Sequence, residues 1–169
     1  MHPSRITHAV LVLIVVLIGG CSSSDSVSQS SASILASGPN AKGTTIVKRV
    51  VDGDTVELLG LGKARLIGID TPEVHGRVEC FGPEASSFAK RTLTFRPVNY
   101  VVGKEPRDKY GRLLVYLTLR NGTFFNAAVI KRGYAVPLAI SPNTRYAGSF
   151  RRLAAAARKA HRGLWKACR

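Results

Sequence analysis

Residues 44–59 read TTIVKRVVDGDTVELL, and this stretch decides the fold. Most of its residues are β-branched or apolar at alternate positions, a pattern typical of strands with one buried face. Asp52-Gly53 interrupts the pattern with a dipeptide that favours a tight turn. The stretch therefore predicts two strands joined by a short turn.

The rest of the chain adds further strands and places helices between and after them. Strands are predicted over 64–69, 98–102 and 113–119, with a turn at 60–63 and a polar loop at 103–109. Helices are predicted from Gly82-Pro83-Glu84 onward, over 124–132 before Gly133, and over 146–161 before Gly163. We expect a mainly β, α+β fold: a five-stranded barrel of the OB type carrying about three helices.

The N-terminal residues are predicted to be a leader and a tether. An apolar run from Ala9 to Ile18 follows Arg5. It is shorter than the roughly 20 residues that span a bilayer but has the length of a signal-peptide core. The small residues Gly19-Gly20 then precede Cys21, which resembles a bacterial lipobox with Cys21 as the lipidated N-terminus. A plain secretory signal or an uncleaved anchor helix fits the same residues.

The segment after Cys21 has the composition of a spacer. Residues 22–43 are rich in Ser, Gly and Ala and contain no aromatic residue, so they bury too little apolar surface to order themselves. We expect a signal peptide over 1–20, a lipidated Cys and tether over 21–43, and one domain over 44–169. The expected location is the extracytoplasmic face of a membrane, held by the lipid, with secretion as the alternative.

The charge of the chain points to a polyanionic partner. Lys and Arg number 25 against 10 Asp and Glu, which gives a formal net charge of +15 at pH 7. Such an excess attracts polyanions and suits sequence-independent contacts with nucleic-acid phosphates. Adhesion to anionic envelope polymers or to lipid head groups is the alternative.

The cysteines support export. If lipid modifies Cys21, then Cys80 and Cys168 remain as an even pair, which in an exported protein predicts a disulfide. That bond would fasten the C-terminal tail to the middle of the domain, and two free thiols are the alternative. No Cys or His cluster has the spacing of a zinc site.

Three short stretches carry the chemistry: VDGDT at 51–55, RLIGIDTPE at 65–73 and DKYGR at 108–112. Together they offer carboxylates for a hard cation, one Glu that is free to act as a base, and two arginines whose planar forks suit phosphate. This is the set of groups that metal-assisted phosphodiester cleavage requires. Taken singly, each stretch is more typical of a hairpin turn, a strand end or a solvated face.

The same stretches, in the same order and spacing, resemble the staphylococcal nuclease-like thermonucleases. The resemblance covers residues 45–166 and rests on the segments VVDGDTVEL, RLIGIDTPE, CFGPEASSFAK and DKYGRLLVY, on the helix end from Asn126 to Gly133, and on RGLW at 162–165. It implies an OB-fold barrel and calcium-dependent hydrolysis of DNA and RNA.

The resemblance also implies a metal site. Asp54 and Asp70 would supply carboxylates to Ca²⁺, and Thr71 would supply its backbone carbonyl. Asp52 would lie behind these ligands as a supporting acid. Two carboxylates and one carbonyl fill only part of a calcium shell of six to eight oxygens, which leaves room for water and a phosphoryl oxygen.

Further roles follow for the residues that would face the substrate. Arg65 and Arg112 would bind the phosphate, and Glu73 would act as the general base. Lys109 and Tyr110 would contact a terminal phosphate of a bound nucleotide. Arginines that bind the developing charge more tightly than the ground state would lower the barrier.

One segment departs from the family pattern. The family has tyrosines after the second helix that stack on a base, whereas residues 135–140 here read AVPLAI. Tyr134 and Tyr146 are the nearest candidates to replace them. Stacking is worth about 1–3 kcal/mol per base, so the departure affects substrate affinity rather than the cleavage residues.

We therefore expect a monomeric, lipid-anchored, calcium-dependent endonuclease that cleaves DNA and RNA with low sequence specificity. By resemblance, its products would carry a 3′-phosphate and a 5′-hydroxyl. Two alternatives are a domain of this fold that binds nucleic acid without cleaving it, and a basic lipoprotein that binds envelope polymers.

Overall fold

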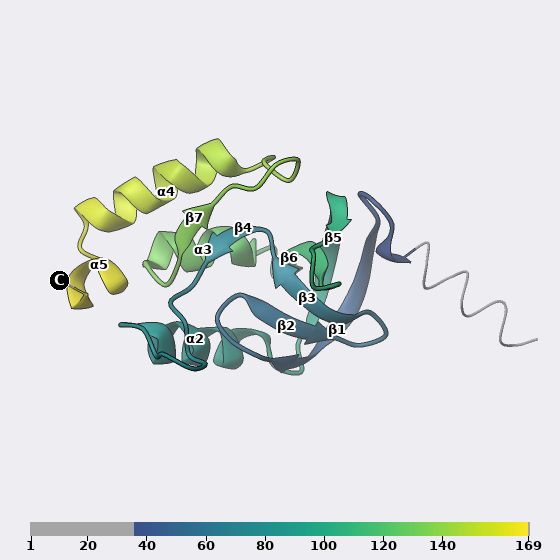
Figure 1. Cartoon of the computed structure of the whole chain (residues 1–169), viewed down its shortest axis with the longest axis horizontal. Coiled ribbons are helices and arrows are strands. Elements are labelled where there is room, and N and C mark those ends of the chain that lie inside the picture. The colour runs from purple at the N-terminus through teal and green to yellow at the C-terminus, as the bar shows by residue number, and fades with distance from the viewer. Residues whose placement is uncertain (1–35, 169) are drawn as a thin grey trace, which may run out of the picture.

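Five strands close into a barrel in the computed structural model, which describes residues 36–168 (Figure 1). The strands are β1 (Lys42–Val50), β2 (Thr55–Leu58), β3 (Gly62–Leu66), β5 (Pro97–Arg107) and β6 (Leu113–Leu119). They follow the order β1-β2-β3-β6-β5, and β5 pairs back onto β1. All neighbours are antiparallel except β3 and β6. The predicted five-stranded barrel is confirmed.

The barrel interior is filled by aliphatic side chains from alternate strand positions. Each of the following residues is at most 1% exposed: Val47, Val56, Leu58, Ala64, Leu66, Val98, Val102, Leu113, Val115 and Leu117. This interior is the rigid base from which the functional loops project.

Helices cover the outside of the barrel. They are α2 (Gly82–Leu93), α3 (Phe125–Arg132), α4 (Ala147–Lys159) and the short α5 (Leu164–Ala167), which the sequence pattern did not predict. In Figure 1, α4, α3 and α2 follow one another from top to bottom on the left, and the barrel strands lie to their right. A two-stranded sheet of β4 (Gly68–Asp70) and β7 (Val136–Leu138) lies between α4 and the barrel.

The predicted strand over 64–69 is two strands, because the chain leaves the barrel at Gly68. This glycine has a φ of 81°, and a Cβ built on it would lie 2.6 Å from the Phe150 ring. Only glycine combines that backbone conformation with the close approach of the ring. Asn126 fixes the same point, since its Nδ2 donates a hydrogen bond to the Ile67 carbonyl at 2.9 Å. The turn carries Asp70 out to the barrel rim.

The predicted polar loop over 103–109 is wrong for residues 103–107, where β5 continues to Arg107. The regular register is broken between Val102 and Arg107. Within this irregular stretch the buried Asn143 side chain pairs with the Glu105 backbone, accepting at Oδ1 from its N–H at 3.2 Å and donating from Nδ2 to its carbonyl at 2.9 Å. The Asn143 amide thus replaces hydrogen bonds that a neighbouring strand would otherwise make to Glu105. The sequence near residue 105 gives no sign of this contact.

The predicted disulfide is present. Cys80 and Cys168, 88 residues apart, are joined with an S–S distance of 2.07 Å and a Cα–Cα distance of 5.8 Å. Within residues 36–168, no helix combines the length and apolar character of a membrane span. The predicted signal peptide, Cys21 and most of the tether lie outside the described residues.

Candidate active site

Arg65 joins the first two acidic stretches into one site. It lies on β3 opposite Thr55 of β2, so its side chain reaches the turn that carries Asp54. Its NH1 lies 3.1 Å from Asp54 Oδ1, and its NH2 lies 2.9 Å from Asp70 Oδ1. Two carboxylates that are far apart in the sequence therefore converge on one guanidinium.

The guanidinium is held in a fixed orientation by the backbone. Its NH1 also donates to the carbonyls of Ile69 at 2.8 Å and Leu66 at 3.2 Å, where the chain leaves the barrel. The side chain is only 14% exposed. NH1 is thus anchored, and NH2 points to the more open side, where the Asp70 side chain is 51% exposed.

Asp52 builds the turn that presents Asp54. Its Oδ1 accepts hydrogen bonds from the backbone N–H groups of Asp54 at 3.0 Å and Thr55 at 2.7 Å. This is the side-chain-to-backbone pattern by which Asp stabilises tight turns. Asp52 therefore lies behind Asp54 and fixes its backbone.

Asp54 is a buried carboxylate with an unusual proton affinity. Its Oδ2 accepts hydrogen bonds from Thr71 N at 2.8 Å and Thr71 Oγ1 at 2.9 Å, and its Oδ1 accepts one from Thr55 Oγ1 at 3.2 Å. Burial nevertheless raises its pKa from 3.8 to about 6, with a further rise from Asp52, against the lowering effects of Arg65 and Thr71. Keeping this carboxylate charged in the folded protein therefore costs free energy.

Asp54, Asp70 and Thr71 fit a hard divalent cation. A cation at Asp54 would offset the desolvation that raises its pKa, and carboxylate and carbonyl oxygens are the donors that calcium prefers. In residues 36–168 there is no cluster of three or more His, Cys, Asp or Glu side chains placed to hold a metal. A cation here would therefore complete its shell with backbone, water and substrate oxygens.

Arg112 approaches the same site from the third stretch. Its Nε donates to Asp108 Oδ2 at 2.7 Å, and its NH1 lies 3.4 Å from Thr55 Oγ1. Asp108 Oδ1 accepts the backbone N–H groups of Tyr110 and Arg112, both at 2.9 Å, which shapes the turn. These hydrogen bonds hold the Asp108 pKa low despite its partial burial. Asp108 thus aims Arg112 toward Thr55, the residue after Asp54.

Lys109 and Tyr110 form the exposed tip of this turn. The Tyr110 ring is flanked by two cations, with Lys109 Nζ 5.1 Å and Arg112 Cζ 5.4 Å from its centroid. Tyr110 is 71% exposed. The predicted nucleotide contacts therefore lie beside Arg112 and open to solvent.

Glu73 follows Asp70 on an exposed loop. Its Oε1 accepts hydrogen bonds from the backbone N–H groups of His75 and Val74, both at 2.8 Å. These bonds, with smaller effects of the His75 and Arg65 charges, lower the Glu73 pKa. The group is thus an ionised carboxylate at neutral pH and lies within electrostatic reach of Arg65.

Sequence comparison agrees with this geometry. The family model described as "Staphylococcal nuclease homologue" matches residues 63–167. The chain belongs to the staphylococcal nuclease family. It is 37% identical over 127 residues to a thermonuclease of Staphylococcus intermedius, covering 72% of this chain and 75% of that protein.

Two further relatives are similar to this chain. A thermonuclease of Staphylococcus hyicus is 37% identical over 125 residues, covering 70% of this chain and 73% of the relative. Endonuclease YhcR of Bacillus subtilis is 35% identical over 144 residues, covering 75% of this chain but only 12% of that much longer protein.

Where the family pattern has stacking tyrosines, this chain has the aliphatic side chains Leu138 and Ile140, which line a hollow beside the two arginines. A hollow of about 460 Å³ runs from Arg65 and Arg112 past Tyr110 to Leu138 and Ile140. Tyr134 and Tyr146, the candidate replacements, do not line it.

Both of these tyrosines are occupied in packing. Tyr134 stacks on Phe88 with centroids 4.5 Å apart, and Tyr146 packs against Tyr116 at 4.9 Å. Tyr110 is therefore the aromatic side chain that this hollow offers to a base.

Several residues that build the site were not identified from the sequence. Asn126 and Asn143 act through buried hydrogen bonds with no local signal. Asp108 could have been found, because it stands four residues before Arg112, a common ion-pair spacing.

Proposed function

We propose that this protein is a calcium-dependent endonuclease that hydrolyses phosphodiester bonds of DNA and RNA with low sequence specificity. Its relatives are named thermonucleases and an endonuclease, which supports a nuclease function. The observation that carries the proposal is the convergence of Asp54 and Asp70 on Arg65, with Arg112 on the other side of Thr55. A domain that only bound nucleic acid would not need this combination.

The chain's own residues supply binding and proton transfer. Arg65 and Arg112 would hold the scissile phosphate, each through a planar fork that stays charged. Glu73 would take the proton of the attacking water, which its low pKa permits at neutral pH. In the products that the family implies, the phosphate stays on the 3′ side and the 5′ oxygen leaves as a hydroxyl.

Calcium held by Asp54, Asp70 and the Thr71 carbonyl would polarise the phosphate and orient the water. Asp52 would keep the Asp54 turn rigid from behind, and Lys109 and Tyr110 would contact a terminal phosphate of a bound nucleotide. The two arginines would then bind the charge that accumulates at phosphorus.

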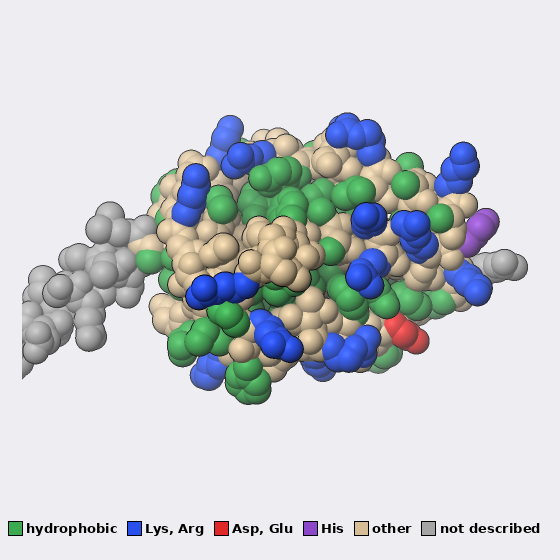
Figure 2. Space-filling model, turned by 180° about the vertical axis from the view of Figure 1, so that it is seen from behind, with side chains coloured by type: hydrophobic (Ala, Val, Ile, Leu, Met, Phe, Trp, Pro, Cys, Tyr) green, Lys and Arg blue, Asp and Glu red, His purple; other side chains and the backbone are tan. Residues whose placement is uncertain are grey.

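Charge distribution supports a polyanionic substrate. No Asp or Glu follows Asp108, whereas 13 of the 25 Lys and Arg residues do. Figure 2 shows the consequence on one face, where Lys and Arg side chains are spread widely and acidic surface is almost absent. Phosphate contacts of this kind carry no sequence information, which fits low specificity.

We also propose that the protein acts as a monomer outside the cytoplasm, tethered through lipid on Cys21. The Cys80–Cys168 disulfide supports the compartment, because such bonds persist in oxidising environments. The lipid would hold the domain at the membrane through the segment between Cys21 and β1, which begins at Lys42.

A plasmid assay tests the function. Purified protein is incubated with supercoiled DNA in calcium or in a calcium chelator, and binding is followed separately by gel shift. Calcium-dependent degradation is expected. Binding of DNA without cleavage in either condition would contradict the proposal and favour a binding module.

A further inference from the structure

The loop that carries Glu73 has little packing of its own. Residues 75–80 are all exposed, and Glu73 itself is exposed. Beside the loop, a hollow of about 280 Å³ is lined by Asp70, Thr71, Pro72, Glu79, Val136, Leu164 and both cysteines. Apolar contacts therefore do not fix the backbone that positions the proposed base.

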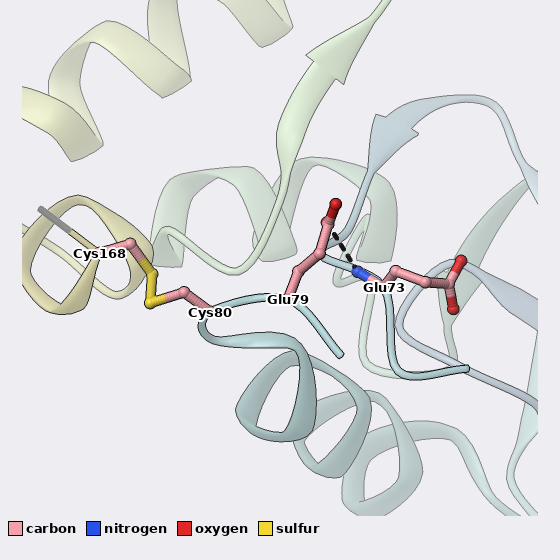
Figure 3. The surroundings of a disulfide bond; sticks show 4 residues. All are labelled: Glu73, Glu79, Cys80 and Cys168. Atoms are coloured by element: carbon pink, nitrogen blue, oxygen red, sulfur yellow. Dashed lines mark hydrogen bonds between the residues drawn. A yellow bond between two sulfur atoms is a disulfide. The ribbon is translucent and has the colours of Figure 1, made fainter. Parts of the chain in front are cut away.

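Two reciprocal hydrogen bonds close the loop instead. The Glu73 N–H donates to Glu79 Oε2 at 3.0 Å, and the Glu79 N–H donates to the Glu73 carbonyl at 2.9 Å. Figure 3 shows that the Glu73 carboxylate points away from Glu79, so the pair holds the backbone of Glu73 without engaging its carboxylate, which accepts instead from the Val74 and His75 N–H groups.

The next residue ties this closure to a remote part of the fold. Cys80 is bonded to Cys168 at the end of α5 (Figure 3). The start of α5 is fixed in turn to α3, because the Leu164 N–H donates to the Gly133 carbonyl at 2.9 Å. The disulfide thus fastens one end of the exposed loop to α5, which is hydrogen-bonded to the end of α3.

Gly82 allows the first residue of α2 to lie close to the Glu73 peptide at the other end of the loop. A Cβ built at Gly82 would lie 2.5 Å from the Glu73 carbonyl oxygen, so glycine allows α2 to begin directly against this peptide. Phe81, between Cys80 and Gly82, stacks on Tyr134 with centroids 5.4 Å apart. These contacts hold residues 80–82 in place. Through its two hydrogen bonds with Glu73, the adjacent Glu79 then restrains the Glu73 backbone.

We propose that Glu79 is a positioning residue for Glu73, and that the Cys80–Cys168 disulfide acts on the active site through Glu79. This rests on the proposed role of Glu73 as the base. Breaking either link would let the loop sample positions in which the Glu73 carboxylate is away from the attacking water. Arg65 and Arg112, not Glu73, would bind the substrate phosphate, so the change should lower kcat and leave substrate binding nearly unchanged.

The first test compares Glu79→Ala with Glu79→Gln, because only glutamine keeps an oxygen that can accept from the Glu73 N–H. Glu79→Ala should lower kcat about 10- to 100-fold with KM within about twofold, as misplaced catalytic groups do. Glu79→Gln should restore most of that loss. Glu84→Ala removes an exposed acid from the same region and should leave kcat unchanged.

The second test is a double-mutant cycle. Cys80→Ser with Cys168→Ser should lower kcat, and adding Glu79→Ala should then lower it much less than it does in the disulfide-bonded protein. All rates are measured well below each variant's melting temperature. Additive losses would show that the disulfide does not act through Glu79, and an unchanged kcat in Glu79→Ala would overturn the positioning role.

The cleavage assay separates failure of the proposed nuclease function from failure of the positioning role of Glu79. If wild-type protein does not cleave DNA in calcium, the proposed function itself fails. If Glu73→Gln is inactive while Glu79→Ala is fully active, the function stands and only this inference is refuted.

Discussion

The guanidinium of Arg65 lies 3.1 Å from the buried carboxylate of Asp54, yet burial still raises the pKa of Asp54 to about 6. One ion pair therefore does not compensate for the desolvation of this carboxylate. In the metal-free protein this carboxylate is therefore harder to ionise than an exposed one.

The first prediction concerns stability without metal. Because the folded pKa of Asp54 exceeds its usual value of 3.8, its contribution to stability is present below about pH 4 and is lost as pH rises through about 6. Asp54→Asn should therefore stabilise the metal-free protein at pH 8 by about 1–3 kcal/mol, with no gain at pH 4. Denaturant unfolding in chelator measures this. A loss of stability at pH 8 would contradict the account of Asp54.

The second prediction concerns phosphate binding by Arg65. Arg65→Lys keeps the charge but loses the fork that spans Asp54, Asp70 and the proposed phosphate, so kcat should fall about 10²- to 10³-fold. Lys63→Ala, on the same strand and exposed, is the matched control and should cleave normally. Wild-type turnover in folded Arg65→Lys would remove the fork from the mechanism.

The third prediction concerns the basic helix α4. Arg151→Gln with Arg152→Gln should weaken the binding of long duplex DNA. The plot of log binding constant against log salt concentration should also become shallower, by about 1 in slope for each phosphate that is no longer neutralised. Lys48→Gln with Arg49→Gln changes net charge equally, but Glu57 already pairs with both cations at 3.1 and 2.9 Å, so the slope should change less.

Fluorescence anisotropy with Glu73→Gln protein measures this binding without cleavage. Equal slope changes in the two pairs would show that α4 has no special part in holding DNA and that net charge alone matters.

The fourth prediction concerns base stacking. Ile140 lines the hollow beside Tyr110 and is 63% exposed, so Ile140→Tyr should supply the missing stacking surface. A gain of about 1–3 kcal/mol for one stacked base would lower KM roughly 5- to 150-fold for a short oligonucleotide. Leu59→Tyr, exposed outside this hollow, is the control. An unchanged KM in Ile140→Tyr would show that bases do not enter the hollow.

The sequence predicts this fold well where periodicity and turn residues agree. The alternating pattern of residues 44–59 and the Asp52-Gly53 turn appear as β1, β2 and the loop between them. It fails where a distant side chain overrides the local pattern. Gly68, against which Phe150 packs, splits the strand predicted over 64–69, and Asn143 pairs with the backbone of residues 103–107 in β5.

The candidate site shows the same division. Asp54, Arg65, Asp70 and Arg112 stand in recognisable stretches, and the structure brings them together around Thr55. Glu79 carries no such signal. Its proposed role rests on a hydrogen bond to the Glu73 backbone, and only the folded chain shows that contact.

The cleavage rate of folded Glu73→Gln in saturating calcium tests directly whether Glu73 activates the attacking water. Loss of the base should lower single-turnover cleavage about 10²- to 10⁴-fold, while the melting curve and the affinity for DNA stay those of the wild type. Cleavage at the wild-type rate by folded Glu73→Gln protein would contradict the account, because water activation would then not depend on Glu73.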